Sequence, residues 1–150
     1  MIARIALTVS VAVAAAAFAA TAVTAQSDPI AARKAQMKST GQQTGIGAKM
    51  AKGEEPFDLA KAKTIFATYE KAAVAMPALF PDTAKSGGDS TAAPKIWEDM
   101  ADFKARFAKF GTDAKAAEAA VKDLDSFKAA FGAVTRNCGG CHELYRIKKS

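Results

Sequence analysis

Both cysteines and the single histidine of this 150-residue chain lie in one five-residue window, Cys138-Gly139-Gly140-Cys141-His142. The spacing Cys-x-x-Cys-His is typical of c-type haem attachment. Two thiols one helical turn apart can bond the two vinyl groups of a haem, and the adjacent imidazole can then reach the iron. On a helix these three side chains share one side, because they stand at positions i, i+3 and i+4. We therefore predict one covalent haem c, attached through Cys138 and Cys141, with His142 as an axial ligand of the iron.

Three other chemistries use the same residue types. A structural zinc site needs four protein ligands, and this window offers two thiolates and one imidazole with no fourth soft donor nearby. A thioredoxin-like redox pair is expected in a βαβ setting, and no strand pattern surrounds the window. A simple disulfide would leave the adjacent His142 without a role. The haem interpretation accounts for all three residues.

The N-terminal segment has the pattern of a signal peptide. Arg4 supplies the positive charge, an apolar run rich in Ala and Val extends from residue 5 to about residue 21, and Val23-Thr24-Ala25 provides small residues for cleavage. The alternative is a retained membrane anchor, since the run is nearly long enough to span a bilayer. The polar residues 26–28 that follow favour cleavage. We expect a signal peptide at 1–25 and an exported mature domain at 26–150, without membrane contact after cleavage.

The mature region is predicted to be almost wholly helical and to form one domain. The first helix should begin at Asp28 as N-cap, with Pro29 at the first helical position, and should end at Gly53. A second helix is expected over about 57–79, with Pro77 bending its end. A long loop follows over 80–93. A third helix should start near Pro94 and extend to about residue 121, and a fourth should follow from residue 123 to about 145.

Apolar residues in the last two helices recur at alternating steps of four and three, which is the period of a left-handed helix bundle. The third helix carries Ile96, Met100, Phe103, Phe107, Phe110, Ala114, Ala117 and Val121, and the fourth carries Leu124, Phe127, Phe131, Val134, Cys138, Cys141 and Tyr145. The second helix carries Phe57, Ile65, Thr68, Ala72, Met76 and Leu79. Four such helices predict an all-α, antiparallel, left-handed four-helix bundle, with the haem cysteines on its core-facing side. Gly41, Gly45 and Gly47 in the first helix either mark a frayed or bent segment or allow close approach of a haem or a helix.

With a haem motif at the C-terminal end of a four-helix pattern, the chain resembles the cytochrome c′ family, the class II c-type cytochromes, over essentially all of 26–150. Besides the haem motif, the resemblance rests on Arg33 with Met37 four residues on, Lys52-Gly53-Glu54-Glu55-Pro56-Phe57-Asp58, Leu79-Phe80-Pro81, Pro94-Lys95-Ile96-Trp97, Phe131-Gly132 and Tyr145-Arg146. In this family the position of Met37 faces the distal side of the iron, and in high-spin members it holds a residue that cannot bind iron. A methionine there resembles the low-spin branch, in which the sixth position is occupied.

A thioether is a soft ligand that suits haem iron, so Met37 is the candidate second axial ligand beside His142. The alternative is that Met37 only fills the core, which is the role expected for the methionines at 50, 76 and 100. The resemblance further implies that Arg33 reaches a haem propionate and that Arg146 lies beside the proximal ligand. The alternatives are a solvated charge near the start of a helix for Arg33 and a favourable cation at the end of a helix for Arg146. It also places Phe80 and Trp97 near the haem, where plain core packing is an equal alternative.

These features predict a periplasmic electron carrier rather than an enzyme, because no carboxylate pair or nucleophile–base pair is evident. The alternative is a five-coordinate, high-spin cytochrome that binds nitric oxide or carbon monoxide, which would need Met37 off the iron. If they flank an exposed haem edge, the cations Lys34, Lys38, Arg136, Arg146, Lys148 and Lys149 would steer an acidic redox partner; the alternative is a generally lysine-rich surface without such a role. The resemblance also implies a homodimer, which sedimentation would test. Nucleic-acid binding has no support in the sequence beyond the positive net charge of +6, and export argues against it.

Overall fold

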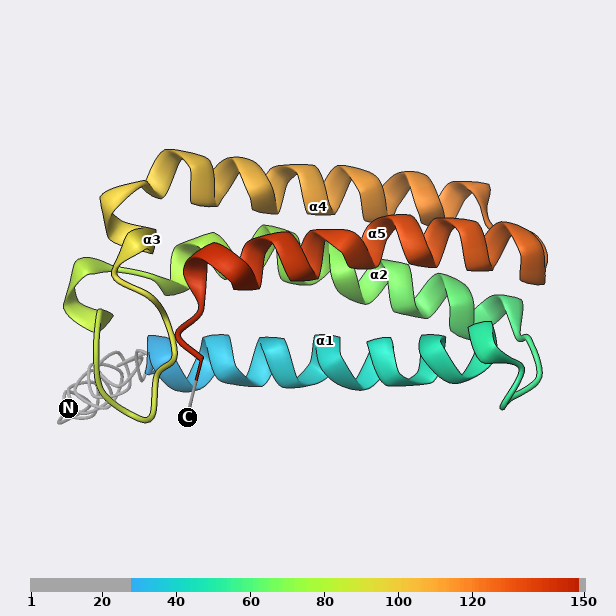
Figure 1. Ribbon diagram of the computed structural model, residues 1–150, viewed down its shortest axis with the longest axis horizontal. Helices are drawn as coiled ribbons and strands as arrows, with labels where there is room; N and C mark the ends of the chain where they lie inside the picture. Colours follow the sequence, from blue (N-terminus) through green and yellow to red (C-terminus); the bar gives the residue numbers. More distant parts are fainter. Residues whose placement is uncertain (1–27, 149–150) are drawn as a thin grey trace, which may run out of the picture.

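The computed structural model describes residues 28–148, and the predicted signal peptide lies outside them. Four long helices follow one another: α1 (Pro29–Lys52), α2 (Leu59–Ala75), α4 (Met100–Ala120) and α5 (Leu124–Tyr145). They run alternately up and down, with the beginning of α1 and the end of α5 at the same end of the molecule (Figure 1). The antiparallel four-helix bundle predicted from the periodicity is confirmed.

The long helices begin where the sequence offers a carboxylate cap. Asp28 Oδ1 accepts a hydrogen bond from the Ile30 amide at 2.9 Å, and Pro29 occupies the first turn, where it has no hydrogen bond to lose. At the other end of α1, Gly53 adopts a left-handed conformation with φ of 78°. Asp123 and Ser126 form a reciprocal capping box at the start of α5. The ends predicted for α1 and the start predicted for α5 are therefore confirmed.

Two expected helices are shorter than the pattern indicated. α2 stops at Ala75 and is followed by a 3₁₀ helix, η1 (Met76–Leu79), because Pro77 cannot donate to the α-helical ladder. The helix expected from Pro94 is interrupted, so that a single turn, α3 (Lys95–Glu98), precedes α4. Asp99 causes the break, since it leaves the helical conformation and its carboxylate accepts the Asp102 amide at 3.1 Å as the N-cap of α4. A second 3₁₀ turn, η2 (Asp82–Ala84), lies in the connecting segment.

The core is built from the apolar faces of all four long helices, and it is rich in edge-on aromatic contacts. The line predicted for α4 is buried along its length except at Met100, which is half-buried. The line predicted for α2 is partly wrong. Thr68 is only half-buried, whereas Phe66 and Tyr69 are fully buried, because α2 packs against both α1 and α4 and must bury a wider face.

The glycines of α1 have different surroundings. A Cβ on Gly47 would press into the ring of Phe131 on α5, so this glycine permits the close approach of the two helices. A Cβ on Gly41 or on Gly45 would meet only open space. α1 is continuous through all three, and the idea of a frayed segment is therefore wrong for this helix.

Candidate functional site

A cavity of about 1310 Å³ lies between α1, α4 and α5 and is also lined by residues of the segment from Met76 to Ile96. Its lining is contributed mainly by apolar side chains of α4 and α5, including Phe103, Phe107, Phe110 and Val134. The residues predicted to bind or surround a haem gather on this one cavity, and they are Arg33, Met37, Phe80, Cys138, Cys141, His142 and Arg146. Trp97 is the exception, since it lies behind Phe80 and not on the cavity wall.

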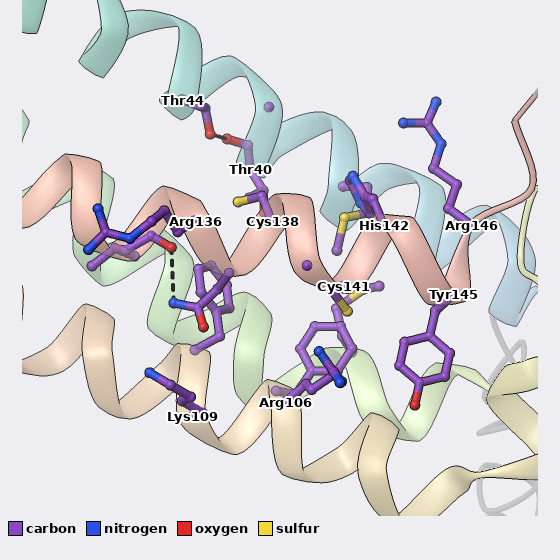
Figure 2. Close-up of a pocket in the computed structure, with 18 of the residues that line it drawn as sticks. Thr40, Thr44, Arg106, Lys109, Arg136, Cys138, Cys141, His142, Tyr145 and Arg146 are labelled. Carbon is purple, nitrogen blue, oxygen red and sulfur yellow. Dashed lines mark hydrogen bonds between the residues drawn. The ribbon is translucent and has the colours of Figure 1, made fainter.

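α5 carries the two thiols and the imidazole side by side, as Figure 2 shows. Both cysteines are free and half-buried, and burial raises the pKa of each thiol above its ordinary value. Partial burial, and secondly the nearby cation of Arg146, lowers the pKa of His142. A neutral imidazole keeps a nitrogen lone pair free for a metal. The three residues are therefore held as neutral groups on an apolar cavity, which suits covalent attachment of a haem.

A test of whether the cavity fits a haem comes from Thr40 of α1. This residue is 7% exposed and lines the cavity, and its hydroxyl is the one buried side-chain polar atom within 28–148 that has no hydrogen-bond partner. A buried hydroxyl without a partner is unfavourable, so Thr40 is expected to donate to an acceptor that comes within reach when the cavity is filled. The thiol pair, the imidazole, the aromatic walls and this hydroxyl together fit an iron porphyrin.

Two thioethers line the cavity, and they differ in position. Met76 of η1 is 2% exposed and belongs to the packed core. Met37 of α1 is half-buried and stands at the cavity surface, on a different helix from His142. Of the two, Met37 is the more exposed, and its role as an iron ligand stays a prediction.

Arg33 is 4% exposed and is already engaged by the connecting segment. Its Nη1 donates to the carbonyl oxygens of Leu79 at 3.2 Å and Ala84 at 3.0 Å, and its Nη2 donates to Ser90 Oγ at 2.7 Å. The guanidinium also lies over the ring of Phe80, 4.7 Å from its centroid. These contacts show that Arg33 fixes the connection between α2 and α4. The contact with a haem propionate stays a prediction.

Phe80 and Trp97 act as a pair. Trp97 Nε1 donates to the Phe80 carbonyl oxygen at 3.1 Å, and the two ring centroids are 6.1 Å apart. Phe80 also meets Phe103 of α4 edge-on at 4.8 Å. Phe80 thus forms part of the cavity wall, while Trp97 supports it from behind.

A polar cluster beside Cys141 was not found from the sequence. The Tyr145 hydroxyl donates to Asp102 Oδ2 at 2.5 Å, and Arg106 Nε donates to the same oxygen at 2.6 Å. Arg106, and secondly Tyr145, hold the pKa of Asp102 below its usual range, while burial and then Asp102 raise the pKa of Tyr145 to about 12. The cluster fixes Arg106 close to Cys141 (Figure 2). The i, i+4 spacing of Asp102 and Arg106 was the available signal.

The end of α5 is tied to the connecting segment. The Ala93 amide donates to the Tyr145 carbonyl oxygen at 3.0 Å, and the Ile147 amide donates to that of Thr91 at 2.8 Å. Arg146 forms an isolated antiparallel bridge with Ala92 within the described chain and lies exposed at the cavity rim. Its predicted place beside the proximal ligand is not tested by these contacts.

Positive charge surrounds the opening of the cavity. Exposed cationic side chains that line it are Lys34, Lys38, Lys109, Arg136 and Arg146. Asp113 is the one acidic residue among the described lining residues, and it is already paired with Lys109 at 2.5 Å. We call the four cations Lys34, Lys38, Arg136 and Arg146 the basic rim.

Two further observations concern residues 28–148. No group of three or more His, Cys, Asp or Glu side chains in this region could hold a metal ion, so the structure offers no support for the zinc alternative. None of the helices described there combines the length and the apolar character needed to cross a bilayer.

Comparison with known proteins gives consistent matches. A sequence model of the cytochrome c′ family matches residues 28–146. The chain is 44% identical over 126 residues to cytochrome c′ of Rhodopseudomonas palustris, covering 84% of this chain and 86% of the relative. It is 39% identical over 118 residues to cytochrome c-556 of Agrobacterium fabrum, covering 78% of this chain and 80% of that protein. A solved structure of the Rhodopseudomonas palustris cytochrome c′ superposes with a TM-score of 0.81 at 46% identity, covering 83% of this chain and all of that one.

Proposed function

The chain belongs to the cytochrome c′ family, and we propose that it is an electron-transfer protein whose haem iron is held between His142 and Met37. Proteins of this family carry haem c attached covalently, and they act in electron transfer or gas binding rather than as typical enzymes. This chain has the two cysteines that the attachment requires. The choice of electron transfer and the identity of the second ligand are the proposal.

When bound, haem c supplies reversible one-electron chemistry at its iron. Cys138 and Cys141 hold it to α5, and the neutral imidazole of His142 offers a ring nitrogen from the same helix. Met37 offers a thioether from α1, and such a ligand raises the reduction potential relative to a site with nitrogen or oxygen donors. The apolar walls keep water away, which favours the less charged reduced state.

The observation that carries this proposal is the position of Met37. It lines the same cavity as His142, and it comes from the neighbouring helix rather than from α5. The other cavity groups of α1 are poor competitors, since Arg33 is engaged by the connecting segment and lysines are cations with no free lone pair at neutral pH. A soft thioether from α1 and an imidazole from α5 on the same cavity support six-coordinate iron.

The test compares Met37→Leu with Met76→Leu in the purified holoprotein. Leucine keeps the volume and apolar character of methionine but cannot bind iron. We expect the unmodified protein to show a low-spin reduced spectrum, a sulfur-to-iron charge-transfer band when oxidised and slow uptake of carbon monoxide. Met37→Leu should abolish all three features, and Met76→Leu should leave them unchanged because that thioether is packed in the core.

A high-spin spectrum and rapid carbon monoxide binding in the unmodified protein would contradict Met37 ligation. The chain would then belong with the gas-binding members of the family. If Met76→Leu rather than Met37→Leu removed the charge-transfer band, the electron-transfer function would stand but the ligand would be misassigned.

The basic rim supports a second part of the proposal, which is that the electron-transfer partner presents an acidic surface. Lys34, Lys38, Arg136 and Arg146 surround the opening with almost no compensating acid, and charge of one sign at such a site speeds encounter with an opposite partner. Lys148 is also exposed, while Lys149 lies outside the described residues. Export to the periplasm and assembly as a homodimer stay predictions.

A further inference from the structure

Thr40 differs from every other threonine in the described α-helices. Those at 44, 64, 68, 112 and 135 each donate their hydroxyl to the backbone carbonyl four residues earlier, at 2.7–3.0 Å. This local bond is the usual way in which a helical threonine satisfies its hydroxyl. Thr40 does not form it, although its side chain is buried. Its hydroxyl is therefore available to an acceptor outside its own helix backbone.

The position of Thr40 restricts what that acceptor can be. Thr40 lines the haem cavity three residues after Met37, so the two side chains lie on the same face of α1. The neighbouring cavity side chains of α1 before it, Arg33, Lys34 and Lys38, carry only hydrogen-bond donors. One turn further on, the Thr44 hydroxyl already donates to the Thr40 carbonyl oxygen and is hydrogen-bonded to the Tyr69 hydroxyl at 2.8 Å. On this face of α1 the side chain with an unused acceptor is Met37.

We propose that Thr40 is a positioning residue for the distal ligand and donates a hydrogen bond to the Met37 thioether when that sulfur is bound to iron. The inference rests on the proposed Met37 ligation and extends it. A thioether sulfur has two lone pairs, so one can bind the iron while the other accepts the Thr40 hydroxyl. The hydrogen bond fixes the orientation of the sulfur and satisfies the buried hydroxyl at the same time.

The bond also has an electronic consequence. A hydrogen bond to a ligand atom withdraws electron density from it, and outer groups of this kind tune a metal site. A hydrogen-bonded sulfur donates less electron density to the iron, and this loss destabilises ferric iron more than ferrous iron, since the ferric ion is the stronger acceptor. Thr40 therefore favours the reduced protein and raises its reduction potential above the value that Met37 and His142 alone would set.

The experiment measures the reduction potential of the holoprotein by optical redox titration in three variants. Thr40→Val keeps the shape of the side chain and removes its hydroxyl, Thr40→Ser keeps the hydroxyl, and Thr64→Val removes an exposed hydroxyl of α2 far from the cavity. We expect Thr40→Val to shift the ferric-to-ferrous equilibrium toward the ferric form by about two- to tenfold, the effect of one modest hydrogen bond. Its sulfur-to-iron charge-transfer band should move as well. Thr40→Ser and Thr64→Val should match the unmodified protein.

An unchanged potential in Thr40→Val overturns the inference, as does an equal shift in Thr40→Ser and Thr40→Val. Either result is distinct from failure of Met37 ligation. In that case the charge-transfer band would be absent from the unmodified protein, and Met37→Leu would change nothing. A charge-transfer band that depends on Met37 but not on Thr40 leaves the proposed function intact and removes Thr40 from it.

Discussion

Replacing Arg33 with methionine should lower the free energy of unfolding by about 3 kcal/mol. Methionine has a similar unbranched stem, so it can still pack against the ring of Phe80, 4.7 Å from the guanidinium in the native chain. What it loses is the charged head group with its donors. The substitution therefore isolates the hydrogen bonds that Arg33 makes to the segment between α2 and α4.

The magnitude follows from three acceptors. The Leu79 and Ala84 carbonyl oxygens and Ser90 Oγ receive hydrogen bonds of 3.2, 3.0 and 2.7 Å from Arg33, which is 4% exposed. Hydrogen bonds from a charged donor contribute about 1.5 kcal/mol each at the lower end of their range, for a total near 4.5 kcal/mol. Burial opposes the charge and lowers the pKa of Arg33, which offsets about 1 to 2 kcal/mol of that gain.

The assay is guanidinium chloride unfolding of the holoprotein, followed by far-ultraviolet circular dichroism. Lys34→Met is the matched control, because Lys34 Nζ donates one exposed hydrogen bond to the Gly88 carbonyl oxygen of the same segment at 3.0 Å. We expect that control to cost less than about 1 kcal/mol. If Arg33→Met cost no more than Lys34→Met, the view of Arg33 as the residue that fixes this segment would be wrong, and contact with a haem propionate would be its main role.

Two other perturbations test the close helix contact and the basic rim. Gly47→Ala should destabilise the protein by about 1 to 3 kcal/mol, because its Cβ would press into an aromatic ring of α5. Gly45→Ala on the same helix should be neutral or stabilising by up to about 1 kcal/mol. Equal effects of the two substitutions in thermal unfolding would refute the close contact. Lys38→Glu should slow oxidation of the reduced protein by ferricyanide several-fold at low ionic strength, and the difference should vanish at about 1 M salt. The control Lys63→Glu changes an exposed lysine of α2 away from the cavity, so it should slow this oxidation much less. An equal slowing in the two variants would assign the effect to net charge and not to the basic rim.

The bundle could be predicted because its determinants are local and periodic. The seven-residue rhythm from Phe103 to Val134 marks the buried faces of α4 and α5 directly, and the residues that cap helices are readable one by one. The break at Asp99 was missed because the apolar rhythm continues through it, and periodicity is insensitive to a single non-helical residue. The available signal was Asp99 itself, because an aspartate can cap a helix by accepting the amide of the residue three positions later, here Asp102.

The predicted site residues other than Trp97 line one cavity, while their roles toward a haem stay predictions. The haem motif needed no tertiary information, since its three residues share one helical turn. The contacts of Arg33 connect it with residues 46 to 57 positions away, and no local pattern reports such a distance in sequence. The same holds for Tyr145 and Asp102, which are 43 positions apart. Thr40 was absent from the predicted site because an orphaned hydroxyl is recognisable only when every neighbouring donor and acceptor has been placed.

Contacts on either side of the proposed distal residues help to hold the cavity face of α1 in place. Near its start Arg33 binds the connecting segment, and fourteen residues later Gly47 packs against Phe131 of α5. At about 1.5 Å per residue, these two contacts hold roughly 21 Å of helix against translation and rotation. Met37 and Thr40 lie between these contacts, so their register on α1 is held from both sides. Gly47→Ala disturbs the contact with Phe131 without touching the cavity, so its effect on stability should be accompanied by a change in the charge-transfer band. A destabilised variant with an unaltered band would show that the contact between Gly47 and Phe131 does not set the register of the distal residues.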